Sequence, residues 1–418
     1  MTVVHDAPRL PRGIGNRAMV ALIGCYLMLQ PISTDLYLAS LPGLATRFGA
    51  TIATVQLTLS MWVVAFGSMQ LVAGPLSDRF GRRPVLTAGL ALFVASSIVC
   101  AAAPSIAVLV AGRFVQGVGC CAVVAVARAI VRDVYEPAAG ARALAQASSI
   151  LAIGPIVGPI LGSVLEVRFG FRGAFVTHVL FGGALLAATL AWFAETNRHR
   201  SPTATRPRTL AASYSLVLRS PEFRAYTLVG GASYGGLFAF ISGASFVLIR
   251  VLGVPTVWFG AAWAFCVSGY LLGTIICRRR LARMSVQRTL RAGASLALAA
   301  GIAMVALAAA GVHHWAAVIG PAFVYFLSHG INFPCGQAGS VAPFPRHAGV
   351  ASGLFGAIVM AMAALTGVWI GETYNGTVYP LAFTIAAFTL LLYATVVGRI
   401  SRMRPRAIPP DSAGPEAG

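Results

Sequence analysis

The sequence predicts an all-α membrane protein with twelve transmembrane helices, arranged as two six-helix pseudo-repeat bundles around a central cavity. Of the 418 residues, 58% are hydrophobic and 10% are charged, whereas soluble domains carry roughly 25% charged residues. Many apolar stretches reach the ~20 residues that a helix needs to cross a bilayer. A long polar loop divides these stretches into two equal sets, which is typical of transporters built from two facing halves.

The predicted spans are apolar runs separated by short polar loops. An even number of spans returns both ends of the chain to the same side of the membrane. In chain order, the twelve spans are Ala18–Leu41, Thr54–Pro75, Pro84–Ala103, Ala107–Arg128, Ala143–Leu165, Gly173–Ala194, Ala225–Ile249, Thr256–Cys277, Ala292–Val312, His314–Gly336, Ala348–Gly371 and Thr377–Gly398.

This pattern divides the chain into five segments. We expect a cytoplasmic N-terminus (1–17), an N-terminal six-helix bundle (18–194), a cytoplasmic linker (195–224), a C-terminal six-helix bundle (225–400) and a short cytoplasmic tail (401–418). The linker contains Ser201–Arg208, whose prolines, small polar residues and arginines predict a flexible basic stretch. The tail is polar and rich in proline, and we expect it to be disordered.

The arginines predict the orientation. All 31 basic residues are arginine, and with the N-terminus inside, the cytoplasmic segments hold 25 of them and the outer loops four. Positive charge accumulates on the cytoplasmic side of membrane proteins, so both termini should be cytoplasmic, in a bacterial inner membrane. The net charge of +20 would also suit nucleic acid. The arginines lie in short loops beside apolar spans, however, so we expect a lipid bilayer as partner and no nucleic acid.

The loop between the second and third spans holds four charged residues within six positions, 78–83. Its candidate functional residues are Gly74, Asp78, Arg79, Gly81, Arg82 and Arg83. We predict that Asp78 pairs with Arg128 or Arg132, at the end of the fourth span, and so holds the cytoplasmic side closed. The alternative is a set of solvated loop charges, each pair worth under ~1 kcal/mol.

Asp35 is the only acidic residue deep inside a predicted span. An aspartate near the centre of a spanning helix costs about 2.5–3.5 kcal/mol, so a functional role is the default. Arg113 lies at a similar depth in the fourth span by the 1.5 Å rise of a helix. We predict that the two form a proton or cation coupling site, either paired or sharing a water-filled cavity. The alternatives are an aspartate at the outer end of its helix and an arginine that snorkels outward.

Weakly polar and aromatic residues within the spans are candidates for a substrate cavity. Tyr234, Phe238 and Ser242 share one helical face, and Tyr325, His329 and Asn332 share another. Walls of this kind suit bulky amphipathic ligands better than sugars, although each residue alone is compatible with simple packing. The cavity candidates are Tyr37, Gln116, Tyr234, Phe238, Ser242, Tyr325, His329 and Asn332, and His178 is a further polar residue in the sixth span.

The fifth span carries glycines four residues apart, which form a smooth face for close helix packing, together with prolines that bend a helix. The residues are Gly154, Pro155, Gly158, Pro159 and Gly162. A kinked helix without further function is the alternative.

These motifs resemble those of the major facilitator superfamily. Residues 74–83 match the loop signature Gly-x-Leu-x-Asp-Arg-x-Gly-Arg-Arg. Arg113 with Gln116-Gly117 is similar to the fourth-span signature of the drug:proton antiporters, and Gly154–Gly162 to their fifth-span signature. Two further runs resemble the bicyclomycin-resistance (Bcr/CflA) branch, namely Asp35-Leu36-Tyr37-Leu38 with Leu41-Pro42, and Ala127–Tyr135.

The resemblance implies a monomer that exports small amphipathic drugs in exchange for protons by alternating access. It implies Asp35 as the proton or cation site, Arg113 as its partner, and Gly154–Gly162 as an interface that resists leak. No metal-ligand spacing occurs among the seven cysteines, and we expect no metal and no cofactor. A proton-coupled transporter of a specific metabolite, such as an amino acid or a sugar, is the first alternative. A membrane enzyme or sensor is the second, although the spans show no paired carboxylates.

Overall fold

The computed structural model describes residues 15–197, 200–202 and 204–403, and within these ranges every regular element is a helix. Residues 1–14 and 404–418, with most of the predicted N-terminal segment and tail, lie outside the described residues. The elements are α1 (Asn16–Asp35), η1 (Leu38–Ser40), α2 (Leu41–Phe48), α3 (Ile52–Phe80), α4 (Arg82–Ala101), α5 (Ile106–Val134), α6 (Pro137–Leu151), α7 (Ile153–Phe169), α8 (Phe171–Trp192), α9 (Pro207–Arg219), α10 (Pro221–Ser245), η2 (Phe246–Val251), α11 (Thr256–Leu281), α12 (Val286–Ala309), α13 (Ala316–Val341), η3 (Pro345–His347), α14 (Ala348–Thr373), α15 (Tyr379–Gly398) and η4 (Ile400–Arg402).

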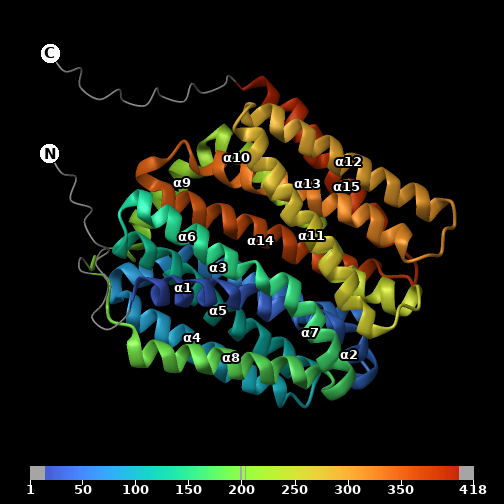
Figure 1. Ribbon diagram of the computed structural model, residues 1–418, viewed down its shortest axis with the longest axis horizontal. Helices are drawn as coiled ribbons and strands as arrows, with labels where there is room; N and C mark the ends of the chain where they lie inside the picture. The colour runs from blue at the N-terminus through green and yellow to red at the C-terminus, as the bar shows by residue number, and fades with distance from the viewer. Residues whose placement is uncertain (1–14, 198–199, 203, 404–418) are drawn as a thin grey trace.

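Twelve segments of the described chain are long and apolar enough to cross a membrane, which confirms the predicted number. Figure 1 shows α1–α8 gathered on one side of the molecule and α10–α15 on the other. We call the end of the spans that carries residues 74–86 the arginine-rich end, and the opposite end the far end.

The two groups of helices meet along α3 with α14 and along α7 with α11. Glycines permit a close approach at these contacts. At Gly371 of α14, a Cβ would lie 2.9 Å from the Cα of Ala53 in α3, and at Gly260 of α11 it would lie 2.5 Å from the carbonyl oxygen of Pro159 in α7. Both contacts lie toward the far end, so the groups are packed backbone to backbone there.

The first span is longer than predicted and is interrupted. It extends over Asn16–Phe48, whereas the sequence predicts Ala18–Leu41. Helix α1 continues through Pro31 and ends at Asp35, after which a short turn leads into η1 and α2. Asp35 therefore lies at a helix break well inside the span, where backbone groups lose their helical partners.

The linker, for which the sequence predicts only a flexible basic stretch, also contains helix α9. Leu210, Tyr214 and Val217 recur at spacings of four and three, so they share one helical face. Val217 is fully buried in a cluster with residues of α14, and the Tyr214 hydroxyl donates to the Leu71 carbonyl of α3 at 2.6 Å. The same spacing in the sequence was the available signal for this helix.

The glycine face of the fifth span packs against the break in α1. A Cβ at Gly154 would lie 3.0 Å from Pro31 Cγ, and one at Gly158 would lie 3.3 Å from Asp35 Cβ. At Gly162 a Cβ would overlap the carbonyl oxygen of Leu36. These glycines therefore position α7 against the segment that carries Asp35, within the first six spans.

We expect Gly162→Ala to destabilise the protein, because the added methyl overlaps the Leu36 carbonyl and overpacking costs about 1–3 kcal/mol. Gly183→Ala in α8 is the matched control, since nothing lies within 4 Å of a Cβ there and alanine favours a helix. Thermal unfolding in one detergent measures both variants. Equal unfolding temperatures would contradict the packing of α7 on the α1 break.

Candidate functional site

Asp35 is buried at the end of α1, with 6% of its surface exposed. The hydroxyl of Thr34 donates to its Oδ1 at 2.8 Å. The ion pairs of the described residues join Arg82 to Asp78 and Asp133, and Arg200 to Glu195, so none of them includes Asp35. A buried carboxylate without a cationic partner is costly in its charged form, which makes this position suited to taking up a proton.

Arg113 lies in the middle of the first helix group and is fully buried. It does not pair with Asp35, and it does not snorkel to a surface. Its Nε donates to the Thr58 carbonyl at 3.2 Å, and its Nη1 donates to the Ser33 carbonyl at 3.0 Å and to Gln116 Oε1 at 2.5 Å. Arg113 thus does not form the pair with Asp35 that the sequence suggests. In this conformation its guanidinium donates to backbone and amide oxygens instead.

Three aromatic rings surround the guanidinium of Arg113. Its Cζ lies 5.0 Å from the centroid of the Tyr37 ring, 5.5 Å from Trp62 and 5.9 Å from Phe175. Within the described residues its Nη2 has no hydrogen-bond partner. The faces of aromatic rings attract a cation, so this enclosure offsets part of the cost of burying a charge without a carboxylate.

Gln116 connects Arg113 to two further helices. Its Nε2 lies 2.7 Å from the Ser97 hydroxyl of α4 and 3.4 Å from Nδ1 of His178 in α8. Nε2 of His178 lies 3.1 Å from the Ile32 carbonyl of α1. The sequence placed Gln116 and Tyr37 in a substrate cavity, and both instead belong to this network, where the Tyr37 hydroxyl donates to Thr58 Oγ1 at 2.8 Å.

The predicted cavity residues of the second half are only partly brought together: Tyr325 and His329 both contact Ser233 of α10, whereas Asn332 lies elsewhere. Tyr234 and Phe238 of α10 stack at 6.4 Å, and the Tyr234 ring lies 6.0 Å from His329. The Tyr325 hydroxyl donates to the Ser233 carbonyl at 2.6 Å, inside the contact between α10 and α13. Asn332 instead lies against Gly293 of α12, where neither amide atom has a partner among the described residues.

Side-chain hydrogen bonds join the two halves toward the far end. Gln56 Nε2 of α3 donates to the Ser242 carbonyl of α10 at 2.5 Å, and Arg250 Nη2 donates to Thr46 Oγ1 at 3.1 Å. Of the described side-chain hydrogen bonds between spans of the two halves, these and the bond from Arg250 to the Pro42 carbonyl all lie at this end. The described side-chain hydrogen bonds between spans of the two halves are therefore concentrated at the far end.

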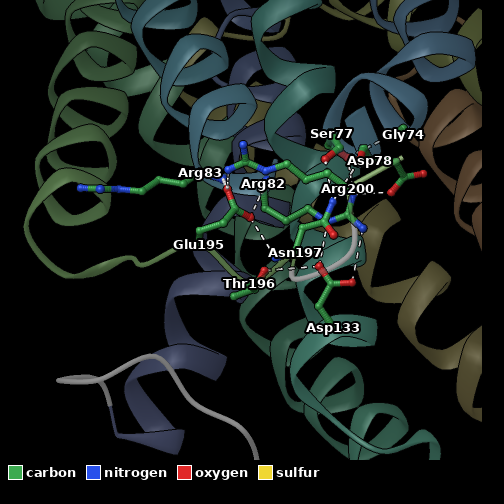
Figure 2. A network of polar contacts seen from close by, with 10 residues as sticks. All are labelled: Gly74, Ser77, Asp78, Arg82, Arg83, Asp133, Glu195, Thr196, Asn197 and Arg200. Carbon is green, nitrogen blue, oxygen red and sulfur yellow. Dashed lines mark hydrogen bonds and ion pairs between the residues drawn. The ribbon is translucent and has the colours of Figure 1, made fainter. Parts of the chain in front are cut away.

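Arg82 is the centre of the charged loop. Gly81 has a φ of 105°, a value that favours glycine, and it allows α4 to begin at Arg82 directly after α3. The Arg82 Nη1 donates to Asp78 Oδ1 at 2.6 Å and its Nε donates to Asp133 Oδ2 at 2.7 Å. Figure 2 shows the guanidinium between the two carboxylates. The loop therefore ties α3 to the end of α5.

The predicted partners of Asp78 are wrong in this conformation. Asp78 pairs with Arg82, four residues later, because the turn at Gly81 brings Arg82 back beneath α3. Arg128 and Arg132 have exposed side chains and take part in none of the described ion pairs. Arg132 Nη1 lies 3.7 Å from the Cβ position of Gly349 at the start of α14, so it is the arginine of this set that reaches the second half.

Glu195 also belongs to the charged loop, and motif matching missed it. Its carboxylate accepts from the backbone N–H of Arg82 at 2.8 Å and of Arg83 at 3.2 Å, at the start of α4. A carboxylate at a helix N-terminus satisfies free N–H groups and complements the helix dipole. The following Asn197 donates from Nδ2 to the carbonyls of Ser77 and Asp78 (Figure 2). The signal in the sequence was an acidic residue directly after the sixth span.

Comparison with known proteins identifies similar chains. Residues 23–368 match the family model described as Major Facilitator Superfamily. The chain is 26% identical to the Bicyclomycin resistance protein homolog of Haemophilus influenzae, over 89% of this chain and 93% of that protein. It is 28% identical to the Multidrug resistance protein MdtL of Escherichia coli, over 82% and 85% of the two chains. It is 33% identical to the uncharacterized MFS-type transporter YdgK of Bacillus subtilis, over 66% and 71%.

Solved structures share the fold. The human organic anion transporter MFSD10 matches with a TM-score of 0.68 and 20% identity, over 93% of this chain and 99% of that chain. The peptide transporter POT in complex with sulfate matches with a TM-score of 0.74 and 12% identity, over 94% and 96%. At such low identity the likeness shows the architecture alone, and it confirms the predicted fold class.

Proposed function

Because the chain belongs to the Major Facilitator Superfamily, we propose that it exports small amphipathic drugs or toxic compounds in exchange for protons, by alternating access. Membership of this family and twelve candidate spans make the protein a multi-pass membrane transporter of small molecules and not an enzyme. The direction of transport, the coupling to protons and the class of substrate are the proposed parts. We further propose that it acts as a monomer.

The observation that carries the proposal is the position of Asp35. It is buried at a break inside the first span, without an ion-pair partner among the described residues. A carboxyl group in this setting is stable when protonated and costly when charged. If the surroundings of Asp35 open alternately to the two sides, the carboxyl can take up a proton on one side and release it on the other.

We propose that Arg113 becomes the partner of Asp35 in another conformation of the transporter. Its guanidinium donates to the Ser33 carbonyl, two residues before Asp35 in the chain, and its Nη2 retains an unused N–H group. A cation that approaches a carboxylate favours release of the proton. We propose that such an approach accompanies opening at the arginine-rich end.

The orientation of the proposed exporter follows from its arginines. The arginine-rich end is assigned to the cytoplasm of a bacterium and the far end to the periplasmic side, with both termini inside. The proposed cycle begins with Asp35 taking a proton from outside while the drug leaves. The inner side then opens, the proton departs into the cytoplasm, and new drug enters.

An aromatic cluster in the second half supports an amphipathic substrate. The Tyr234 ring packs against Phe238, His329 and Phe333. Apolar walls with few polar groups suit such ligands better than sugars. The names of two similar proteins, which refer to bicyclomycin resistance and to multidrug resistance, point to the same class.

Drug-induced proton release from everted membrane vesicles tests the proposed function. Vesicles from cells that express the protein are energised, a pH-sensitive dye reports their acid interior, and amphipathic cationic compounds are added. We expect several unrelated compounds to release protons, whereas vesicles without the protein should show no release. Release by a single amino acid or sugar alone would support the transporter of a specific metabolite instead, and no release by any solute would refute proton-coupled export.

A further inference from the structure

His178 of α8 is buried at the centre of the first six spans, and none of its surface is exposed. Its ring packs at 5.5 Å from that of Phe175 and at 6.0 Å from that of Phe93. Each of its nitrogens has a polar neighbour, Gln116 at Nδ1 and the Ile32 carbonyl at Nε2. When each neighbour of such a histidine can only donate or only accept a hydrogen bond, the neighbours fix which ring nitrogen carries the proton.

The neighbours of His178 determine that arrangement, beginning at Arg113. A guanidinium has only donors, and Arg113 Nη1 lies 2.5 Å from Gln116, so the amide oxygen of Gln116 must face it. The Ser33 hydroxyl donates to the same oxygen at 3.4 Å. The amide nitrogen of Gln116 therefore points the other way, toward Ser97 and His178.

The same argument continues through the imidazole ring. The Gln116 amide nitrogen donates, so Nδ1 of His178 must accept. The Ile32 carbonyl can only accept, so Nε2 of His178 must carry the proton. The ring is then neutral, with its single proton on Nε2.

The charged and titratable groups around the ring agree with a neutral histidine. Arg113 on α5 places a positive charge next to Gln116, and Asp35 on α1 lies three residues beyond Ile32. Tyr37 donates its hydroxyl proton to Thr58 and not to the ring, while α4 presents Phe93. A second proton, on Nδ1, would face the N–H groups of Gln116, and rotating that amide would turn its nitrogen toward Arg113.

The hydrogen-bond chain ends at two neighbouring carbonyls of α1, those of Ile32 and Ser33. Both belong to the last turn of α1: the Ile32 carbonyl also accepts from the Leu36 backbone N–H, whereas Tyr37 N–H donates to Thr34 and leaves the Ser33 carbonyl without a helical partner. His178 donates to the first and Arg113 to the second. The end of α1 that carries Asp35 is thus held by two side chains that are joined to each other through Gln116.

We propose that His178 is a positioning residue that completes the hydrogen-bond chain from the Ile32 carbonyl through Gln116 to Arg113, in the direction that the guanidinium imposes. It thereby orients Arg113 relative to Asp35 and stabilises the end of α1. Its effect on transport rests on the proposed function, in which Asp35 carries the proton. The arrangement of its protons does not depend on that function.

The proton arrangement is tested by ¹⁵N NMR of the full chain in lipid bilayers, labelled at its seven histidines. The His178→Phe variant identifies the signals of His178. We expect a neutral ring at pH 7 with the proton on Nε2 and an accepting Nδ1. In Gln116→Leu, the Nδ1 signal should shift toward that of a nitrogen without a hydrogen bond. A proton on Nδ1, or a doubly protonated ring, would overturn the proposal.

The positioning role is tested by three variants in the vesicle assay, with rates divided by the amount of folded protein. His178→Phe keeps a ring against Phe93 and Phe175 but has no nitrogen. We expect it to lower kcat about tenfold with KM changed less than about twofold, since a residue away from substrate alters turnover more than binding. His178→Asn keeps an acceptor for Gln116 and should restore most of kcat, whereas His178→Gln keeps only a donor for Ile32 and should not.

Each outcome of the vesicle assay supports or overturns the positioning role of His178. A wild-type kcat in His178→Phe, or equal losses in all three variants, would overturn the positioning role. Restoration by His178→Asn alone would support it, because of the three variants only His178→Asn can place an acceptor at the position of Nδ1. If the wild type releases no protons, the proposed function fails, and the NMR measurement still decides the direction of the chain.

Discussion

The Asp35→Asn variant is expected to lose proton-coupled export while remaining folded. The asparagine carboxamide has the shape of a protonated carboxyl and can still accept from Thr34, which donates to Asp35 at 2.8 Å. It cannot release a proton. One proton that crosses a potential of 100 mV supplies about 2.3 kcal/mol, enough to sustain a roughly 50-fold gradient of a neutral drug. We expect the variant to accumulate no such gradient.

Drug-induced proton release and drug accumulation in everted vesicles measure this effect, and a resistance panel measures it in cells. Glu372→Gln is the matched control, because Glu372 is an exposed carboxylate in α14 at the same far end. It should retain wild-type activity. Full proton-coupled export by Asp35→Asn would show that the proton is carried elsewhere.

The Arg82→Ala variant is expected to show the largest loss of stability among the loop arginines. It would leave Asp78 and Asp133 facing each other without the guanidinium that now lies 2.6 and 2.7 Å from their oxygens. Removing one partner of a buried ion pair costs about 3–5 kcal/mol. We expect the lower end of this range, since the Asp78 side chain is 43% exposed.

Two neighbouring arginines provide the controls for Arg82. Arg79 is exposed and donates to Thr205, and Arg83 is exposed and donates to the Leu190 carbonyl. Alanine at either position should cost under ~1 kcal/mol, as for other exposed polar contacts. Arg82→Lys should be intermediate, because one ammonium cannot bond both carboxylates as a planar fork does. Thermal unfolding in detergent measures all four, and equal effects at the three arginines would contradict the network.

The charged loop shows how far motif reasoning extends. Its pattern identified Asp78 and Arg82 as important but assigned Asp78 to Arg128 or Arg132, because those residues end a span at the same depth. Depth restricts partners to one level of the membrane and does not choose among them. The choice was made by the turn at Gly81, which places Arg82 one helical turn from Asp78 and beside Asp133.

Arg113 shows a similar limit. Because Arg113 and Asp35 lie at similar depth, the sequence predicted that they pair. Arg113 does bind α1 near Asp35, at the Ser33 carbonyl two residues earlier. The end of α1 at Asp35, however, leaves the Ser33 carbonyl without a helical partner, and this carbonyl accepts from the guanidinium. A helix break is difficult to read from a sequence in which α1 passes through Pro31 and stops four residues later.

The sequence by itself determined the class and the number of spans, because apolar length is a local property of the chain. Only the tertiary structure decided the partners: Arg82 for Asp78, Gln116 and two carbonyls for Arg113, and His178 for the end of α1. Such partners come from helices far apart in the chain. They are chosen by close packing at glycines and by carbonyls that a helix break leaves free, neither of which a hydrophobic pattern records.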